Sequence, residues 1–256
     1  MQVVRKERAD APEGFFEAEA AGLAWLADAG GVATPRVIDV GPGRIVLERI
    51  RTVRPDAAAA RAFGCALAET HLAGADAFGA PPAGWGGPLY IGRREMPRTT
   101  SDSWGRFYAT ARVLPFVDVA VDAGNLTSAE ADLVRRACDP VADGAFDDDS
   151  PPARIHGDLW NGNVLFSPDG VVVIDPAAHG GHGETDLAML DLFGCPGLDD
   201  VLAGYDEVAS PRAGRRERVP LHQLHPLAVH AAGHGRAYGV ALADAARRVL
   251  HLAARR

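Results

Sequence analysis

Apolar residues recur along this chain at two different spacings, and the spacing changes near residue 50. Before that point, short apolar runs typical of strands flank one stretch in which apolar residues recur every three or four positions. This pattern predicts a strand at Val3-Val4, a helix over Phe15–Ala29, and strands at Val37–Val40 and Ile45–Leu47. Gly41-Pro42-Gly43 lies between the last two strands and is typical of a turn.

From Asp56 onward the helical spacing dominates. Helices are expected over Ala57–Ala73, around Trp104–Val121, over Ser128–Cys138 and from Thr185 onward, with a Gly/Pro-rich loop at Gly79–Pro88. One hairpin interrupts them, because apolar runs flank Pro168-Asp169-Gly170 between residues 164 and 175. The sequence therefore predicts an α+β protein with two lobes. A small β-rich N-lobe spans 1–50, and a larger, mainly helical C-lobe spans 51–256.

The hairpin joins two parts of a motif with its own chemistry. His156-Gly157-Asp158 and Asn163 precede it, and Asp175 follows it directly. Phosphoryl transfer from ATP needs a carboxylate that accepts the proton of the attacking hydroxyl, and an amide and a second carboxylate that hold Mg²⁺. Protein kinases space these groups as H-x-D-x-x-x-x-N, and this chain has the same spacing. We therefore expect Asp158 to be the catalytic base, and Asn163 and Asp175 to bind Mg²⁺ at one end of the hairpin.

The first lobe carries candidates for nucleotide binding. A kinase uses a lysine on a strand to contact the ATP phosphates and a helical glutamate to orient it. Lys6 ends the first strand and is the only lysine of the chain, and Glu19 shares the inward face of the next helix. Leu47-Glu48-Arg49-Ile50 is expected to be the hinge, with Glu48 and Ile50 near adenine. A two-lobed, protein-kinase-like fold with ATP in the cleft accounts for these features.

One element of a protein-kinase N-lobe is not found in the sequence. Kinases cover the phosphates with a Gly-rich hairpin that precedes the lysine strand. Only five residues precede Lys6, and none of them is glycine. The N-lobe is therefore expected to be shortened: either the natural start lies upstream of Met1, or the phosphates are bound without this loop.

Composition limits the cellular compartment and the partners that are expected for this protein. The formal net charge of −8 argues against a nucleic-acid-binding surface, and no apolar run reaches the roughly 18–20 residues of a membrane span. Cys65, Cys138 and Cys195 are far apart and odd in number, which favours reduced thiols over a disulfide framework. We expect a cytoplasmic protein with no nucleic-acid or membrane partner, and the oligomeric state stays open.

The chain resembles the fructosamine/ketosamine-3-kinases, a branch of the aminoglycoside-phosphotransferase-like kinases. The resemblance runs from Val4 to about Val240. It rests on four segments: His156–Asn163 with Trp160, Asp175-Pro-Ala-Ala-His-Gly-Gly-His-Gly-Glu184-Thr-Asp186, Phe15–Leu23, and Ser103–Phe107 with Arg112.

This resemblance implies that ATP phosphorylates the C3 hydroxyl of a ketosamine, a sugar joined to an amine by non-enzymatic glycation. The phosphorylated adduct decomposes and frees the amine, and ribulosamines, erythrulosamines and fructosamines are the candidate substrates. The resemblance also implies that His156 and Asp186 brace the catalytic loop. Trp160 is expected either to stack on the sugar or to lie in the core under the loop, and His179 and His182 are expected near the substrate entrance.

Two other functions stay open at this level. One is phosphorylation of another small hydroxylated amine such as an aminoglycoside, against which Trp160 and Asp175-Pro-Ala-Ala argue. The other is a nucleotide-binding pseudokinase, which the absent Gly-rich hairpin suggests. The intact set of Asp158, Asn163 and Asp175 opposes the pseudokinase.

Two histidines outside the motif have metal-binding spacing. His230 and His234 are four residues apart in a predicted helix, which would allow both to bind zinc. No glutamate lies between them as in H-E-x-x-H, so we expect helix packing or cleft lining instead.

Overall fold

The structure, a computed structural model, describes residues 2–210 and 212–256. Its strands are β1 (Val3–Glu7), β2 (Val37–Gly41), β3 (Arg44–Glu48), β4 (Leu89–Ile91), β5 (Arg94–Met96), β6 (Ala153–Ile155), β7 (Val164–Ser167), β8 (Gly170–Val173) and β9 (His179–Gly181). Its α-helices are α1 (Phe15–Asp28), α2 (Ala57–Leu72), α3 (Trp104–Phe107), α4 (Leu114–Asp122), α5 (Ser128–Ala142), α6 (Gly183–Leu192), α7 (Leu198–Val208), α8 (Arg215–His222), α9 (Leu224–Ala231) and α10 (Arg236–Ala253). None of these helices is long and apolar enough to cross a membrane.

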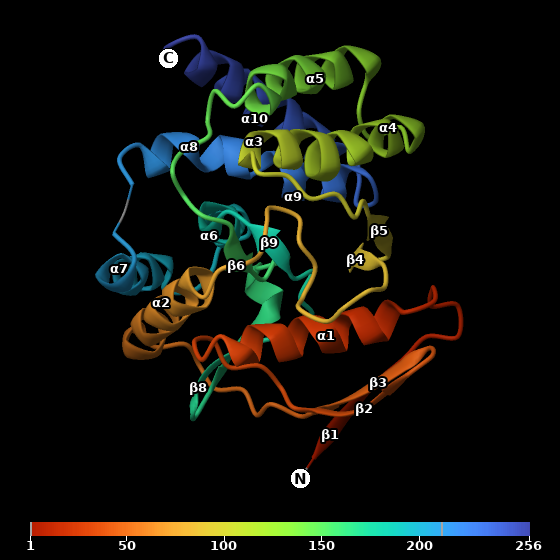
Figure 1. Ribbon diagram of the computed structural model, residues 1–256, viewed down its shortest axis with the longest axis vertical. Helices are drawn as coiled ribbons and strands as arrows, with labels where there is room; N and C mark the ends of the chain where they lie inside the picture. The colour runs from red at the N-terminus through yellow and green to blue at the C-terminus, as the bar shows by residue number, and fades with distance from the viewer. Residues whose placement is uncertain (1, 211) are drawn as a thin grey trace.

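A three-stranded antiparallel sheet forms one end of the molecule. Its strand order is β1-β3-β2, and α1 lies between it and the helical body (Figure 1). Phe16 and Leu23 of α1 pack on Ile45 and Leu47 of β3 in a small separate core. The predicted order of strand, helix, strand, strand is therefore confirmed, and β1 runs on past Val4 to include Lys6.

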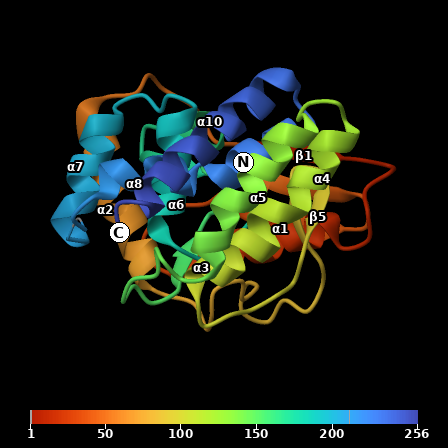
Figure 2. The ribbon, with the colours of Figure 1, turned by 90° about the horizontal axis from the view of Figure 1, so that it is seen from above.

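The helical body has two larger cores. One lies among α4, α5, α9 and α10, and seen from above α5 and α10 run alongside each other (Figure 2). The other lies between α2, α7 and the β7–β8 hairpin, and it includes Trp25 and Leu26 from the end of α1. The helix that carries Glu19 is therefore packed against the hairpin that carries the expected metal ligands.

Four local features differ from the sequence analysis. The β4–β5 hairpin and the pairing of β6 with β9 were not predicted, because strands of three residues are too short to show a period of two. The helix around residues 104–121 contains one π-helical segment, Tyr108–Val113, between α3 and α4. The helix predicted to end at Cys138 continues through Pro140 to Ala142.

Helices α2 and α7 approach each other through two glycines. A Cβ atom on Gly64 of α2 would overlap the carbonyl oxygen of Val201, and one on Gly204 of α7 would overlap that of Arg61. These overlaps involve backbone atoms, which cannot move aside as a flexible side chain can. The close approach therefore depends on both glycines.

We expect Gly64→Ala to lower the free energy of unfolding by about 3 kcal/mol, at the upper end of the range for overpacked cores. Urea denaturation would measure this change. Gly86→Ala is the matched control, because Gly86 faces open space. Equal stability of the two variants would contradict the close packing of α2 on α7.

Candidate active site

The catalytic loop and the hairpin after it bring the motif residues together. Strand β6 ends at Ile155, and the hairpin register pairs Val164 with Val173. Asn163 and Asp175 thus lie at the same open end of the hairpin, where the N–H of Ile174 donates to the carbonyl oxygen of Asn163 at 3.1 Å. Asp175 has a φ of 56°, in the left-handed region that aspartate enters more readily than most side chains.

Asp158 and Asn163 are linked directly. The side-chain N–H₂ of Asn163 donates to the backbone oxygen of Asp158 at 2.8 Å and lies 3.4 Å from its carboxylate. This leaves the amide oxygen of Asn163 available as a ligand. Both residues line a cleft of about 340 Å³, together with Lys6, Glu19 and Asp175.

Lys6 bridges two carboxylates across the cleft. Its Nζ donates to Glu19 Oε1 at 2.6 Å and also to Asp175 Oδ1. Burial lowers the pKa of Lys6, but the two carboxylates outweigh burial and the net direction is upward. Burial raises the pKa of Glu19, against the opposing effect of Lys6. The structure thus brings the strand lysine, its helical glutamate and the residue after the hairpin into one ion-paired group.

Asp158 differs from an ordinary surface carboxyl. Burial, and then the charges of Asp175 and Asp186, raise its pKa to about 7. A carboxylate with such a pKa is a stronger base than an exposed aspartate, and it is still partly ionised at neutral pH. The cleft can therefore provide a proton acceptor matched to neutral conditions.

A buried carboxylate fixes the backbone of the catalytic loop. Asp186 accepts hydrogen bonds from the N–H of His156 at 2.8 Å and from the N–H of Gly157 at 3.0 Å. His156 in turn accepts the N–H of Asp158 at Nδ1, 3.2 Å away, and donates from Nε2 to the carbonyl oxygen of Ile174 at 2.9 Å. His156 and Asp186 thus connect the loop to the residue preceding Asp175.

Sequence reasoning missed two residues behind this loop. His71 of α2 donates from Nε2 to Asp186 at 3.1 Å, and its Nδ1 lies 2.9 Å from the hydroxyl of Tyr205 on α7. No local pattern marks either residue, because 115 positions separate His71 from Asp186 and 134 separate it from Tyr205.

Trp160 lies at the edge of the cleft and starts a series of rings. Its side chain is 40% exposed, and its ring centroid lies 6.1 Å from that of Phe193. Phe193 is followed by His230 at 4.7 Å, and His230 by His234 and Tyr238 at 5.0 Å each. We call these five residues the aromatic surface.

The four other residues expected near nucleotide or substrate do not line the cleft around Asp158. Glu48 belongs to β3, where its N–H donates to the carbonyl oxygen of Arg36, and Ile50 follows that strand. The adenine-facing role of Glu48 and Ile50 stays a prediction. His179 and His182 are both buried, so neither lies at an open entrance to the cleft.

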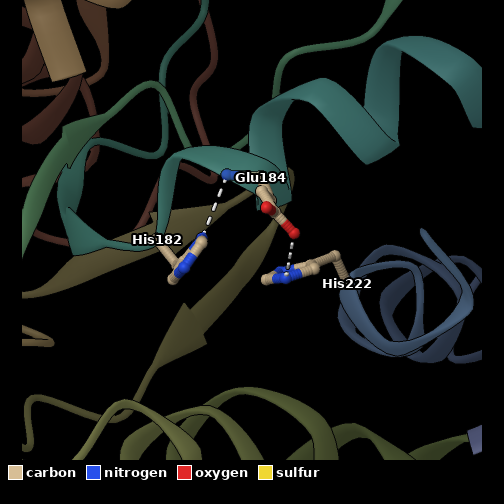
Figure 3. Close-up of side chains that lie close together, drawn as sticks. All are labelled: His182, Glu184 and His222. Carbon is tan, nitrogen blue, oxygen red and sulfur yellow. Dashed lines mark hydrogen bonds and ion pairs between the residues drawn. The ribbon is translucent and has the colours of Figure 1, made fainter. Parts of the chain in front are cut away.

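His182 belongs instead to a buried ionic cluster with Glu184 and His222 (Figure 3). The arrangement has the ligand types of a metal centre, but Arg218 donates to both oxygens of Glu184, at 2.8 and 2.5 Å. His222 Nε2 lies 3.3 Å from Glu184, and Nδ1 of His182 accepts the N–H of Glu184. Burial raises the pKa of Glu184, but His222 and Arg218 lower it further than burial raises it. A guanidinium already neutralises the carboxylate, so we interpret the cluster as an ion-pair network that holds α8 on the start of α6.

Known protein sequences resemble the chain over nearly its whole length. A family model described as fructosamine kinase matches residues 3–252. A probable ketoamine kinase of Synechocystis is 32% identical over 224 residues, which cover 84% of this chain and 72% of that relative. A probable ketoamine kinase of Enterococcus faecium is 28% identical over 230 residues, 89% of this chain and 80% of its own length.

Solved structures share the fold. A putative fructosamine-3-kinase of Thermobifida fusca superposes with a TM-score of 0.90 at 48% identity, covering 97% of this chain and 85% of that one. A choline/ethanolamine kinase family protein of Mesorhizobium loti has a TM-score of 0.60 at 18% identity, covering 99% and 87% of the two chains. The predicted α+β, kinase-like fold is therefore confirmed.

We expect Asp158→Asn to stabilise the protein, and increasingly so as the pH rises from 4 to 8. The folded-state pKa of Asp158 lies above its unfolded value, so ionisation of this half-buried carboxyl opposes folding above about pH 4 and asparagine removes that penalty. A gain on the order of 2 kcal/mol at pH 8 is expected from urea denaturation. A gain that does not depend on pH would show that the pKa of Asp158 is not raised.

Proposed function

The chain belongs to the fructosamine kinase family and is a phosphotransferase, and from this premise we propose that it uses ATP to phosphorylate the C3 hydroxyl of a ketosamine. The phosphorylated adduct then decomposes and the amine is freed. One observation carries the chemical part of the proposal. Asp158, the half-buried candidate base, shares a cleft with two oxygen-bearing side chains, Asn163 and Asp175, and with the ion-paired Lys6.

Asp158 accepts the proton of the C3 hydroxyl. Its pKa of about 7 supports this role, because a base is most effective when its pKa lies near the working pH. His156 and Asp186 are not in contact with the substrate in this proposal. They hold the backbone of the loop, so that Asp158 keeps its position while it takes up the proton.

The donor set of the cleft fits a hard divalent cation. Asn163 offers an amide oxygen and Asp175 a carboxylate, the ligand types that Mg²⁺ prefers. Bound there, Mg²⁺ would supply positive charge that offsets the phosphate oxygens. Lys6, which Glu19 orients, provides a second positive charge on the same side of the cleft.

The aromatic surface supports a substrate that carries an amine. Trp160 is the member that also lines the cleft with Asp158, so a sugar bound at Asp158 would direct its amine toward these rings. Cations are attracted to aromatic ring faces. The cleft also carries three carboxylates, those of Glu19, Asp158 and Asp175, against the single cation Lys6, which favours a protonated amine over an anion.

The decisive experiment offers ATP and Mg²⁺ together with ribulose-, erythrulose- and fructose-lysine in parallel. We expect turnover of at least one ketosamine, and a decrease in kcat of about 10²- to 10⁴-fold in Asp158→Asn, because the general base is removed. Asp169→Asn is the matched control, since this exposed aspartate lies in the turn of the same hairpin.

Two results would oppose the proposal. Rapid phosphorylation of an aminoglycoside without turnover of any ketosamine would show that the chain is a kinase for another small hydroxylated amine. Binding of ATP without turnover of any acceptor would favour a pseudokinase.

We expect Trp160→Leu to raise KM for the ketosamine about two- to fivefold, the range for an exposed ring contact with a cation, while KM for ATP stays the same. Steady-state kinetics with each substrate varied in turn would separate the two constants. An equal rise in both would show that the ring supports the loop and does not contact the sugar-amine.

A further inference from the structure

Arg112 is buried in the helical body without a carboxylate partner. Its side chain is 1% exposed and lies in the π-helix Tyr108–Val113, over the ring of Phe107 at 4.5 Å. In the described part of the chain it forms no ion pair, and its Nη2 has no hydrogen-bond partner. Burying a guanidinium in this way is costly, and an apolar side chain would fill the space more favourably. A reason other than stability is therefore needed.

The hydrogen bonds of Arg112 connect it to the cleft around Asp158. Its Nη1 donates to the carbonyl oxygens of Pro97 and Ala111, both at 3.0 Å, which fixes the guanidinium group. Its Nε donates to Nε2 of His179 at 3.2 Å. Because Nε2 accepts, the proton of the neutral imidazole is on Nδ1. Nδ1 then donates to the carbonyl oxygen of Ala177 at 2.7 Å.

Ala177 is two residues beyond Asp175 and lines the cleft. Its carbonyl group also faces the catalytic loop, since a Cβ atom on Gly157 would overlap the oxygen of Ala177. His179 itself pairs with Ile155, the last residue of the strand that leads into that loop. The donor–acceptor series from Arg112 to Ala177 therefore ends where the metal-binding and catalytic segments touch.

We propose that Arg112 and His179 are positioning residues, which hold the segment after Asp175 through the Ala177 carbonyl group and so set the orientation of the Asp175 carboxylate toward Mg²⁺. This inference rests on the proposed function, because it takes Asp175 as the metal ligand. Neither residue contacts substrate or nucleotide. Their effect is transmitted through one backbone carbonyl group, in the way that outer hydrogen bonds orient the ligands of other metal sites.

The test compares two substitutions of His179. His179→Leu removes both hydrogen bonds, whereas His179→Gln keeps one N–H donor and one oxygen acceptor. At saturating ATP we expect His179→Leu to raise KM for Mg²⁺ about 10- to 100-fold, with little change in KM for the ketosamine, and His179→Gln to recover most of the loss. Arg112→Met should change the same constant in the same direction.

Arg154→Met is the control for loss of a partly buried arginine. The backbone of Arg154 pairs with Gly180, but its side chain stacks on Trp25 and donates to the carbonyl oxygens of Trp25 and Gly74, outside the segment after Asp175. Thermal unfolding shows which variants are folded. If Arg112→Met does not fold, the comparison of His179→Leu with His179→Gln decides the outcome. An unchanged KM for Mg²⁺ in folded His179→Leu, or an equal rise in Arg154→Met, would overturn the proposal.

Calorimetric titration with Mg·ATP separates this inference from the proposed function, because it needs no turnover. If the wild-type protein binds Mg·ATP but phosphorylates no ketosamine, the proposed substrate is wrong. The titration still tests the positioning residues in that case. Weaker binding by His179→Leu, restored by His179→Gln, would support them on its own.

Discussion

The buried carboxylate of Asp186 determines where the catalytic loop lies, because two consecutive backbone N–H groups of that loop donate to it. A carboxylate in the interior is stable only when donors satisfy its oxygens. Here the N–H groups of His156 and Gly157 and the imidazole of His71 do so, at 2.8, 3.0 and 3.1 Å. Burial raises the pKa of Asp186, but these donors and the nearby histidines lower it further, so the carboxyl stays ionised. One charge on α6 thus joins the loop to α2 and, through Tyr205, to α7.

Acidic side chains outnumber basic ones in the cleft in front of this loop. Three carboxylates line the cleft with one lysine, and burial, together with the charge of Asp175, raises the pKa of Glu19 and of Asp158. A cation bound near Asp175 would offset that charge and would lower the pKa of Asp158. On the proposed function, the protonation of Asp158 is therefore coupled to cation binding at Asp175.

The sequence predicted those features that local spacing encodes. The hairpin between Asn163 and Asp175 follows from two apolar runs around a turn, and the inward position of Glu19 follows from helical periodicity. Contacts between segments that are far apart in the sequence are not encoded in local spacing. His71, Tyr205 and Arg112 form hydrogen bonds with residues 67 to 134 positions away, and their local spacing predicts none of these contacts. Local spacing likewise gives no sign of the contact between His182 and His222, because α8 brings His222 to it.

Lys6 is the only lysine among the 26 lysine and arginine residues of the chain. Its amine is held between Glu19 and Asp175, which keep it protonated and therefore unreactive toward carbonyl groups. Guanidinium groups, which supply the remaining cationic side chains, form no ketosamines. If the chain acts on glycated amines as proposed, it presents almost no side-chain amine of its own that sugars can modify. The one side-chain amine lies in the cleft around Asp158, between the two carboxylates that keep it protonated.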